Sequence, residues 1–493
     1  MMSFQRYHPL TILFEVAGFI KSTAIFAFLL FVVKFGSTSV LIQIGQWGFL
    51  AVTALTLITL VMKWFANRYA TDDQGFHIKS GIFSKIERTV YYEKIQNVQR
   101  QTSFLHKLFR MTSITFETGA GSADASVEFA VLTKEEADRL EVLVDGTTAE
   151  RASAETANET VPGVRIPDRV IHFTPTRGDL IKATFTSLSF LFLIAIAGSL
   201  FSKLDAVFNV EERVEGWLLA VLTSGWVIAV ATILLIIVSF AAGFIRTFIT
   251  YGKYEIASDD SRIYISKGVL NESAFSILKR RVQGVEITQS FMKRLLGLAE
   301  VKLISAGGLG EGEQEISILY PFLPVNRANS IISELLPDYK VSSELKRLPR
   351  KSLAVRLVRP YWFWLVVTVI LAFIKPEPFG FQAAWWTASL GLLLVLVLSR
   401  IADYWNTKYA VTDGLIQVRE GALETTTYLS RRDKIIEVSV KRTKFQQWTG
   451  LATIGFINRA QSVRHETLKD VPIDDAEQFF VWYAKRSAEI QVE

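Results

Sequence analysis

Residues 79–110 read KSGIFSKIERTVYYEKIQNVQRQTSFLHKLFR, and this stretch has two diverged counterparts further along the chain. Residues 266–298 read SKGVLNESAFSILKRRVQGVEITQSFMKRLLGL. Residues 419–451 read REGALETTTYLSRRDKIIEVSVKRTKFQQWTGL. Each stretch has a glycine near its start and an Ile/Val-x-x-Val motif in its middle, so the three predict a repeated structural unit, which we call a module.

The repeat is defined by fixed offsets from the glycine, without a gap in any copy. The glycines are Gly81, Gly268 and Gly421. Fourteen residues later come Ile95, Val282 and Ile435. Seventeen residues after the glycine come Val98, Val285 and Val438. Chance alternation of apolar residues seldom reproduces such a register three times.

Around these positions the pattern predicts short strands followed by one helix. A strand with alternating apolar residues turns at the glycine, where a positive φ is tolerated. A second strand, the Ile/Val-x-x-Val strand, a short hydrophobic turn and another hairpin follow. An amphipathic helix then ends each copy, expected at Lys134–Val144, Asn326–Leu336 and Asp474–Arg486. Each module is therefore expected to form a small curled antiparallel sheet capped by its C-terminal helix.

Long apolar stretches precede each of these segments in pairs. Hydrophobic residues make up 50% of the 493 residues and the mean hydropathy is +0.28, above what a soluble chain of this size carries. A helix needs about 20 apolar residues to cross a bilayer. The candidate spans are Val16–Val33, Trp47–Trp64, Ala183–Phe201, Trp217–Phe240, Tyr361–Ile374 and Ala383–Ser399. Tyr361–Ile374 is short, and the alternative for it is a re-entrant or interfacial helix.

Cations gather on one side of the spans, and the loops between paired spans are poor in them. Since Lys and Arg beside spans mark the cytoplasmic face, the sequence predicts a multi-pass protein of the cell membrane with both termini and all three β-rich segments in the cytoplasm. The densest cationic cluster precedes the fifth span: Lys346, Arg347, Arg350, Lys351, Arg356 and Arg359. This cluster acts as a topology signal or binds anionic lipid headgroups.

These patterns define an α+β membrane protein in which a transmembrane hairpin and a curled sheet capped by a helix occur three times. The expected boundaries are hairpin 1 at 1–65, domain 1 at 66–145, a flexible linker at 146–168, hairpin 2 at 169–249, domain 2 at 250–340, a basic juxtamembrane segment with hairpin 3 at 341–402, and domain 3 at 403–493.

The order of elements resembles the bacterial PH-like domain, and the whole chain is similar to the large, three-repeat members of the YdbS/YdbT type of membrane proteins. The residues that carry the resemblance are the turn glycines, Ile95-Gln96-Asn97-Val98 with Val282-Gln283-Gly284-Val285, the turn Leu295-Leu296-Gly297-Leu298, and Arg6-Tyr7-His8-Pro9-Leu10. The third copy, Ile435-Ile436-Glu437-Val438, lacks the glutamine. The resemblance implies a smaller one-hairpin PH-like membrane protein as partner, and an envelope role such as protection against membrane-active antimicrobial peptides.

No residue pattern points to an enzyme. The chain has no cysteine, and its 5 histidines do not pair at metal-ligand spacing, so we expect no catalytic, cofactor or metal site. The glycine-rich run Gly307–Glu313 lies between expected strands and carries acids that would repel phosphate. The net charge of +6 is too small to indicate nucleic-acid binding. Only Glu15 and Lys21 approach the apolar core of a span, which favours anchoring hairpins over a transport path.

Binding remains as the expected activity. Basic residues follow the glycine in each copy, at Lys85–Arg88, Lys279–Arg281 and Arg431-Arg432, on what the pattern predicts to be strand edges, and in the second and third copies they lie ten to thirteen residues after it. They contact anionic lipid or protect a solvated sheet edge. The candidate lipid or partner contacts are Arg280, Arg281, Arg431, Arg432, Lys346, Arg347, Arg350 and Lys351. We expect a scaffold or accessory protein that binds membrane lipids or protein partners and forms homo- or hetero-oligomers; the alternative is a subunit of an export or lipid-translocating complex.

Overall fold

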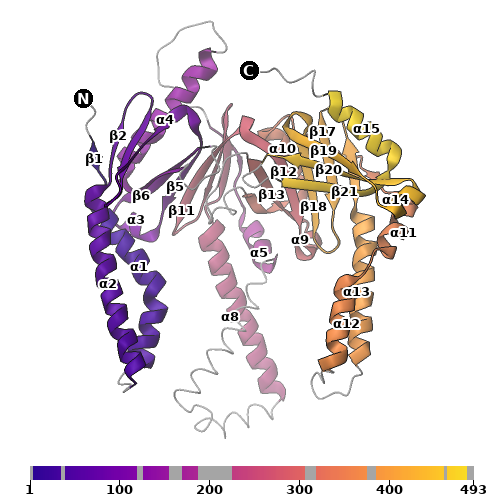
Figure 1. The fold of residues 1–493 in the computed structure, drawn as a ribbon, viewed down its shortest axis with the longest axis horizontal. Coiled ribbons are helices and arrows are strands. Elements are labelled where there is room, and N and C mark those ends of the chain that lie inside the picture. Colours follow the sequence, from indigo (N-terminus) through magenta and orange to yellow (C-terminus); the bar gives the residue numbers. More distant parts are fainter. Residues whose placement is uncertain are drawn as a thin grey trace. The chain divides into compact units, whose positions relative to one another are not determined.

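The computed structural model describes residues 4–34, 39–118, 126–154, 169–186, 225–305, 318–374, 385–412, 414–459 and 464–485 (Figure 1). The chain divides into two compact units. The first comprises Met1–Asp168 with Ser266–Leu278, and the second comprises Arg169–Ile265 with Lys279–Glu493. The first unit therefore contains a strand from the second module.

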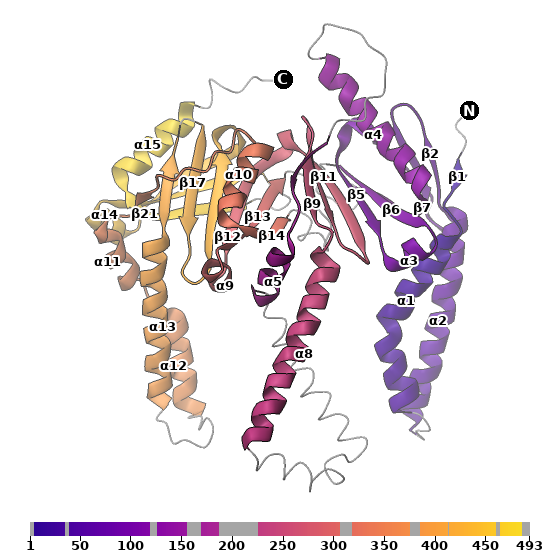
Figure 2. The same cartoon turned by 180° about the vertical axis from the view of Figure 1, so that it is seen from behind.

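Apolar helices form the hairpins. In the first unit α1 (Leu10–Phe28), continued by the π-helical turn η1 (Leu29–Val33), lies antiparallel to α2 (Val40–Ala66) (Figure 1). In the second unit α12 (Trp362–Ile374) and α13 (Trp385–Asn406) form the third hairpin (Figure 2). Among the described residues four helices are long and apolar enough to cross a membrane, when α12 is counted together with the preceding α11.

The second hairpin is described only in part. Helix α8 (Gly225–Tyr251) overlaps the predicted fourth span and continues past it, and α5 (Arg177–Thr186) covers the start of the third. The rest of Ala183–Phe201 lies outside the described residues. The short fifth span is 13 residues of α12, preceded by α11 (Arg350–Val358) with a break at Arg359–Tyr361. At 1.5 Å per residue α12 alone is about 20 Å long, less than the ~30 Å hydrocarbon core.

Each hairpin is inserted between two paired strands. In module 1, β1 (Gln5–Arg6) before the hairpin pairs with β2 (Arg68–Thr71) after it. In module 2, β8 (Val170–Phe173) pairs with β9 (Glu255–Ser258), and in module 3, β15 (Lys346–Arg347) pairs with β16 (Lys408–Val411). The leading strands could not be predicted because they are two to four residues long, too short to show alternation.

The turn glycines are confirmed. Gly81 separates β3 (Gly75–Ser80) from β4 (Ile86–Tyr91), and φ at Gly81, Gly268 and Gly421 is +102°, +97° and +115°. A Cβ at these positions would lie 1.9, 1.9 and 2.0 Å from the backbone oxygen of Ser84, Asn271 and Glu424. No side chain fits there, which explains why glycine fixes the register of all three modules.

The corresponding hairpins of the other modules flank the same glycine. They are β10 (Arg262–Lys267) with β11 (Glu272–Leu278), and β17 (Leu415–Glu420) with β18 (Thr425–Arg431). The second half of each module is a three-stranded meander. The strands are β5 (Ile95–Thr102), β6 (Met111–Thr118) and β7 (Ser126–Thr133); β12 (Val282–Gln289), β13 (Leu298–Ser305) and β14 (Ile318–Pro324); and β19 (Ile435–Lys441), β20 (Leu451–Asn458) and β21 (Arg464–Pro472).

Helices close each meander as predicted. They are α4 (Lys134–Ala154), α10 (Val325–Leu335) and α15 (Ile473–Ala484). Helix α4 runs ten residues beyond its expected end at Val144, into the segment expected to be a linker. The predicted hydrophobic turns are the short helices α3 (Phe104–Leu108), α9 (Phe291–Leu295) and α14 (Lys444–Thr449), whose N-caps Ser103, Ser290 and Thr443 each accept a backbone N–H.

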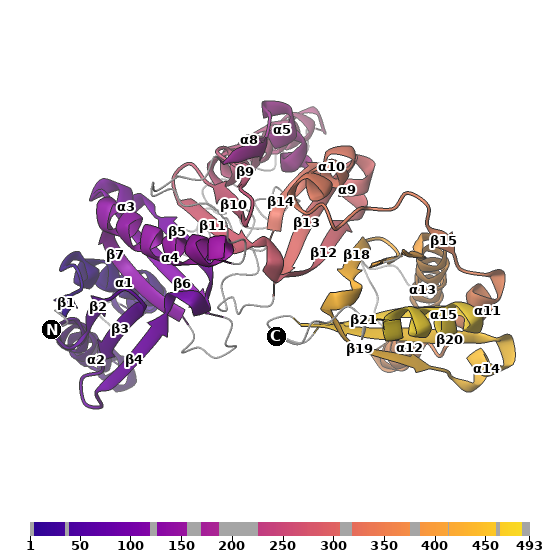
Figure 3. The same ribbon diagram turned by 90° about the horizontal axis from the view of Figure 1, so that it is seen from above.

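The sheets cross the boundaries between modules. In the first unit the orders are β1-β2-β3-β4 and β7-β6-β5-β11, where β11 comes from module 2. In the second unit β12 of module 2 pairs with β18 of module 3, giving β14-β13-β12-β18-β17-β16-β15, and β19-β20-β21 forms a separate sheet (Figure 3). Instead of one closed sheet per module, the second half of a module shares a sheet with strands of the next.

The repeat-defining apolar residues lie in the cores. Ile95 and Val98 pack with Phe76, Phe116 and Phe129 in the first unit. Val282, Val285 and Ile435 are at most 1% exposed, whereas Val438 on β19 is only partly buried against its core.

Candidate anion-binding site

A basic cavity of about 360 Å³ lies in the second unit, where module 2 meets module 3. Its lining residues are Lys279, Arg280, Val282, Leu335, Leu336, Pro337, Asp338, Tyr339, Arg431 and Lys434. Four of these side chains are cationic and one is anionic. The cavity therefore has the charge and roughly the size to hold a small anionic group.

Two tight turns place the cations. The 3-10 turn η4 (Lys279–Arg281) joins β11 to β12, and η6 (Arg432–Lys434) joins β18 to β19. The backbone N–H of Lys279 donates to the Ser261 carbonyl and that of Arg432 donates to the Gly414 carbonyl, both at 2.9 Å. Lys434 Nζ also donates to the Arg280 carbonyl at 3.4 Å, which links the two turns. Because each turn is held by such bonds, the cations enter the cavity from fixed backbone positions.

Burial and nearby acids shift the pKa of two lining cations, Lys279 and Arg431, in opposite directions. Burial lowers the pKa of the Lys279 amine, while Asp259 and Asp260 oppose that shift. Burial also acts to lower the pKa of Arg431, but the hydrogen bond from its Nε to Asp433 at 2.8 Å and the charge of Asp338 outweigh it, so the pKa rises.

A buried tyrosine closes one side of the cavity. Tyr339 donates its hydroxyl proton to the Val282 carbonyl at 3.1 Å, and burial raises the pKa of that phenol. The phenol therefore stays neutral and adds no negative charge.

The predicted contact residues divide between the cavity and other roles. Arg280 and Arg431 both line the cavity, although they belong to different modules. Arg281 and Arg432 do not: Arg432 is 8% exposed, donates to the Trp482 carbonyl at 3.2 Å and lies over that indole. The predicted strand edges at Lys279–Arg281 and Arg431-Arg432 are corrected in part, because Lys279–Arg281 and Arg432 lie in 3-10 turns.

Sequence reasoning did not find Lys434, Asp338 and Tyr339. Lys434 lies three residues after Arg431, a spacing that could have indicated it. Asp338 and Tyr339 follow helix α10 and reach the cavity only through tertiary packing. Gln283, the glutamine that the third copy lacks, is 8% exposed and donates to the Arg281 carbonyl at 3.2 Å, which gives it a structural role.

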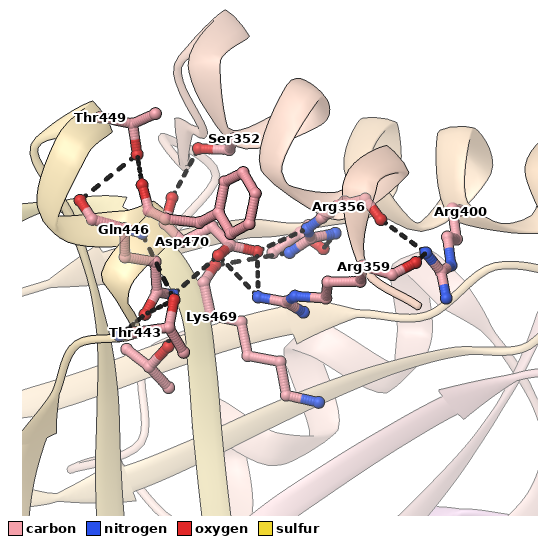
Figure 4. Close-up of polar contacts among 12 residues, drawn as sticks. Ser352, Arg356, Arg359, Arg400, Thr443, Gln446, Thr449, Lys469 and Asp470 are labelled. Atoms are coloured by element: carbon pink, nitrogen blue, oxygen red, sulfur yellow. Dashed lines mark hydrogen bonds and ion pairs between the residues drawn. The ribbon is translucent and has the colours of Figure 1, made fainter. Parts of the chain in front are cut away.

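The juxtamembrane cluster also divides in two. Lys346, Arg347, Arg350 and Lys351 are exposed, and Lys346 pairs with Asp475 at 2.5 Å. Arg356 and Arg359, from the same cluster, turn inward toward Asp470 on β21 (Figure 4). The four exposed side chains are therefore better placed for a lipid surface than Arg356 and Arg359.

Asp470 is the centre of a buried charge network. Its side chain is fully buried and accepts from Arg356 Nε at 3.3 Å, from an Arg359 guanidinium nitrogen at 2.6 Å and from Gln446 Nε2 at 2.8 Å (Figure 4). Its backbone has φ of +64°, a left-handed conformation that aspartate tolerates better than most residues. The network joins α11 and α14 to β21 of domain 3.

The third hairpin is bonded to the same network. Arg356 also pairs with Asp403 of α13 at 2.7 Å, and the other Asp403 oxygen accepts the backbone N–H of Gly421 at 3.0 Å. Arg400 donates to the Arg356 and Arg359 carbonyls at 2.8 and 2.6 Å, which satisfies the C-terminal end of α11 (Figure 4). Hairpin and domain are thus joined by charged contacts as well as by chain connectivity.

A metal centre is not evident among the residues that the structure describes. The described residues contain no group of three or more His, Asp or Glu side chains that could hold a metal ion. The glycine-rich run at 307–313 lies outside the described residues.

Comparison with known proteins accounts for the triplicate architecture. The bacterial PH domain family matches three segments, residues 13–147, 192–338 and 357–487. The chain belongs to the bacterial PH domain family, which confirms the resemblance read from the glycine register and the Ile/Val-x-x-Val motif.

A relative with the same extent also exists. The chain is 23% identical over 440 residues to the UPF0699 transmembrane protein YdbT of Bacillus subtilis (strain 168), and the match covers 87% of each chain. No solved structure matches the chain. The protein is thus a membrane protein with three bacterial PH domains, similar to YdbT along nearly its full length.

Proposed function

We propose that this membrane protein is a non-enzymatic scaffold whose PH domains face the cytoplasm and bind anionic lipid headgroups. The observation that carries the proposal is the cavity where Lys279, Arg280, Arg431 and Lys434 from two modules face a single lining acid, Asp338. A phosphate group is a good match, because several donors can surround it at once.

The hairpins support an anchoring role. The ionisable residue Glu15 on α1 forms an ion pair with Lys63 on α2 at 3.6 Å, so the two charges offset one another within the helix pair. Such a pair strengthens the association of two helices without forming a path for polar cargo. We propose that the hairpins hold the domains at the membrane surface, where the exposed Arg347, Arg350 and Lys351 add electrostatic attraction.

The size of the lipid contribution follows from the cations that have no carboxylate partner within hydrogen-bonding distance. Lys279 and Arg280 form no ion pair with the described acidic residues, whereas Arg431 pairs with Asp338 and Asp433. At about 1 kcal/mol per cation near an anionic surface, the two contribute about 2 kcal/mol, or roughly 30-fold in affinity.

The test uses the whole chain, because the sheets run across module boundaries and an isolated domain would lose strands. Purified protein in detergent is titrated with phosphatidylglycerol or phosphatidylcholine, and bound lipid is counted by native mass spectrometry. We expect the double variant Lys279→Gln/Arg280→Gln to bind phosphatidylglycerol 10- to 30-fold more weakly, from the estimate of about 2 kcal/mol. Competition by inorganic phosphate separates the headgroup phosphate from the acyl chains as the source of affinity.

A matched control is Lys134→Gln/Lys444→Gln, which removes two exposed cations that do not line the cavity. It should leave binding unchanged. If the cavity variant binds phosphatidylglycerol like the parent protein, the headgroup proposal is wrong.

The wider role rests on the resemblance. We propose that the scaffold serves the bacterial envelope, with a smaller one-hairpin PH-like membrane protein as partner and protection against membrane-active antimicrobial peptides as the outcome. Capture of the tagged chain from native membranes should recover that partner, and deletion of the gene should lower the concentration of such a peptide that arrests growth.

A further inference from the structure

Two strands of the described chain have a sheet neighbour on one side only, although their counterparts in other modules have one on both. Strand β4 pairs with β3 alone, and β19 pairs with β20 alone. The counterparts of β4 are β11 and β18, and the counterparts of β19 are β5 and β12. Those counterparts pair with each other: β5 with β11, and β12 with β18.

The two internal pairings obey the same register. Val98 on β5 lies opposite Ser276 on β11, and Val285 on β12 lies opposite Leu429 on β18. In both cases the residue seventeen positions after one glycine faces the residue eight positions after the next module's glycine. Each ladder has six residue pairs in this register. The rule is thus a property of the module and not of one boundary.

We propose that β19 of one chain pairs with β4 of a second copy of this chain, in the same antiparallel register. The rule places Val438 opposite Thr89, Val440 opposite Glu87, and Lys441 opposite Ile86. The contact is head-to-tail, because it joins the last module of one copy to the first module of the next. Repetition of such a contact builds a ring or an open array.

Burial of apolar side chains supports the pairing. Tyr91 on β4 is 47% exposed, whereas its counterpart Leu278 on β11 is 3% exposed. Val440 on β19 is 37% exposed, whereas its counterpart Ile287 on β12 is 8% exposed. Ile86 and Ile436 on the two edges are also about half exposed. The unpaired edges thus expose apolar residues at positions that an inter-module ladder covers in the interior of the chain.

Charge complementarity is favourable within the ladder and unfavourable at its end. Glu437 lies opposite Val90, so Arg88 is its diagonal neighbour on the same face, a distance that long side chains bridge. Arg442 faces Lys85, but these residues lie just past the end of β19 and just before the start of β4, where both side chains reach solvent. Charges such as these deter promiscuous edge pairing, so the edges favour a partner in the correct register.

Disulfide trapping tests the pairing without background, because the chain has no cysteine. Two single variants, Thr89→Cys and Val438→Cys, are co-expressed with different tags, and membranes are oxidised before solubilisation. We expect a disulfide-linked dimer that carries both tags. Lys441→Cys with Ile86→Cys gives a second pair, three positions further along the ladder. Residue pairs in an antiparallel ladder alternate between hydrogen-bonded and non-hydrogen-bonded positions, so one of these two pairs has the closer, non-hydrogen-bonded geometry.

The control is Thr89→Cys with Ser439→Cys, which moves one thiol by a single residue to the opposite face of the ladder. It should cross-link far less than the in-register pairs. Each variant is first checked for normal membrane insertion and melting temperature, so that absence of a cross-link cannot come from misfolding.

Three results would overturn the proposal. One is the lack of a mixed dimer for both in-register pairs in correctly folded protein. A second is a dimer of Thr89→Cys with itself, which would show β4 pairing with β4. A third is a double variant, Thr89→Cys/Val438→Cys, that links only within one chain, which would show that the edges meet intramolecularly or that another protein separates the copies.

Discussion

Replacement of Asp470 by asparagine tests whether the buried charge network holds hairpin 3 to domain 3. Asparagine keeps the size of the side chain and tolerates the left-handed backbone at φ +64°, so the variant removes the charge with little other change. Arg359 then loses its carboxylate, and the new amide group presents a donor where Arg356, Arg359 and Gln446 already donate.

The expected cost follows from burial. Removal of one partner from a buried ion pair costs about 3–5 kcal/mol. Arg356 is 6% exposed but retains Asp403, and Arg359 is 36% exposed and can reach water. The loss should therefore lie at the low end, about 3 kcal/mol. For domains of 150–250 residues this corresponds to a fall in melting temperature of about 6–12 °C.

The assay is thermal unfolding of the purified chain in detergent, followed by tryptophan fluorescence. The matched control is Asp338→Asn, which breaks the pair with Arg431 at a carboxylate that is 69% exposed. An exposed pair contributes about 0–1 kcal/mol, so the control should melt close to the parent. If Asp470→Asn melts within about 2 °C of the parent, a shift below 1 kcal/mol by the same scaling, the network does not couple hairpin and domain as described.

Two further substitutions test the turn and a half-buried acid. Gly421→Ala should lower stability by at least about 1–3 kcal/mol, because its Cβ would lie 2.0 Å from the Glu424 backbone oxygen at φ +115°. The control Gly391→Ala in α13, whose Cβ would have no atom within 4 Å, should not lower stability. Equal melting temperatures for the two variants would contradict the assigned turn. Burial, reinforced by Glu466 and Asp403, raises the pKa of Glu420 above its ordinary 4.5, so the folded state keeps this proton to higher pH than the unfolded chain and stability falls as the pH rises above about 4.5. Glu420→Gln should therefore raise the melting temperature at pH 7 and flatten its decline between about pH 4.5 and 7. The control Glu424→Gln, at an exposed residue, should do neither. An unchanged pH profile for Glu420→Gln would refute the raised pKa of Glu420.

Much of the architecture could be predicted because local chemistry determines it. Glycine is required at positions 81, 268 and 421 because a Cβ there would clash with a backbone oxygen. Ile95, Val282 and Ile435 mark buried strand positions. Both signals are carried by single residues at fixed spacing. The meanders and their closing helices follow from the same short-range patterns.

Features that depend on distant partners were missed. Strands β1, β8 and β15 are too short to show a pattern, and they pair with strands that follow a whole hairpin. The sharing of sheets between modules could not be predicted, because β4, β11 and β18 follow the same glycine turn in the sequence. Among the strands that the structure describes, only β11 and β18 pair with a strand of the preceding module. Within the site, Arg280 and Arg431 could be selected by charge, but Arg432 could not be told apart from them until its contact with Trp482 was known.

The sharing of sheets between modules constrains how the protein can be made. The ribosome completes β5–β7 with residue 133, yet their neighbour β11 spans residues 272–278, beyond the second hairpin. The edge of β5 must therefore stay open, and protected from wrong pairing, until the membrane insertion machinery has processed two more helices. The same delay recurs between β12 and β18. Biogenesis of the PH domains is thereby tied to the pace of insertion, and a stalled hairpin would leave an open sheet edge for quality-control proteases to recognise.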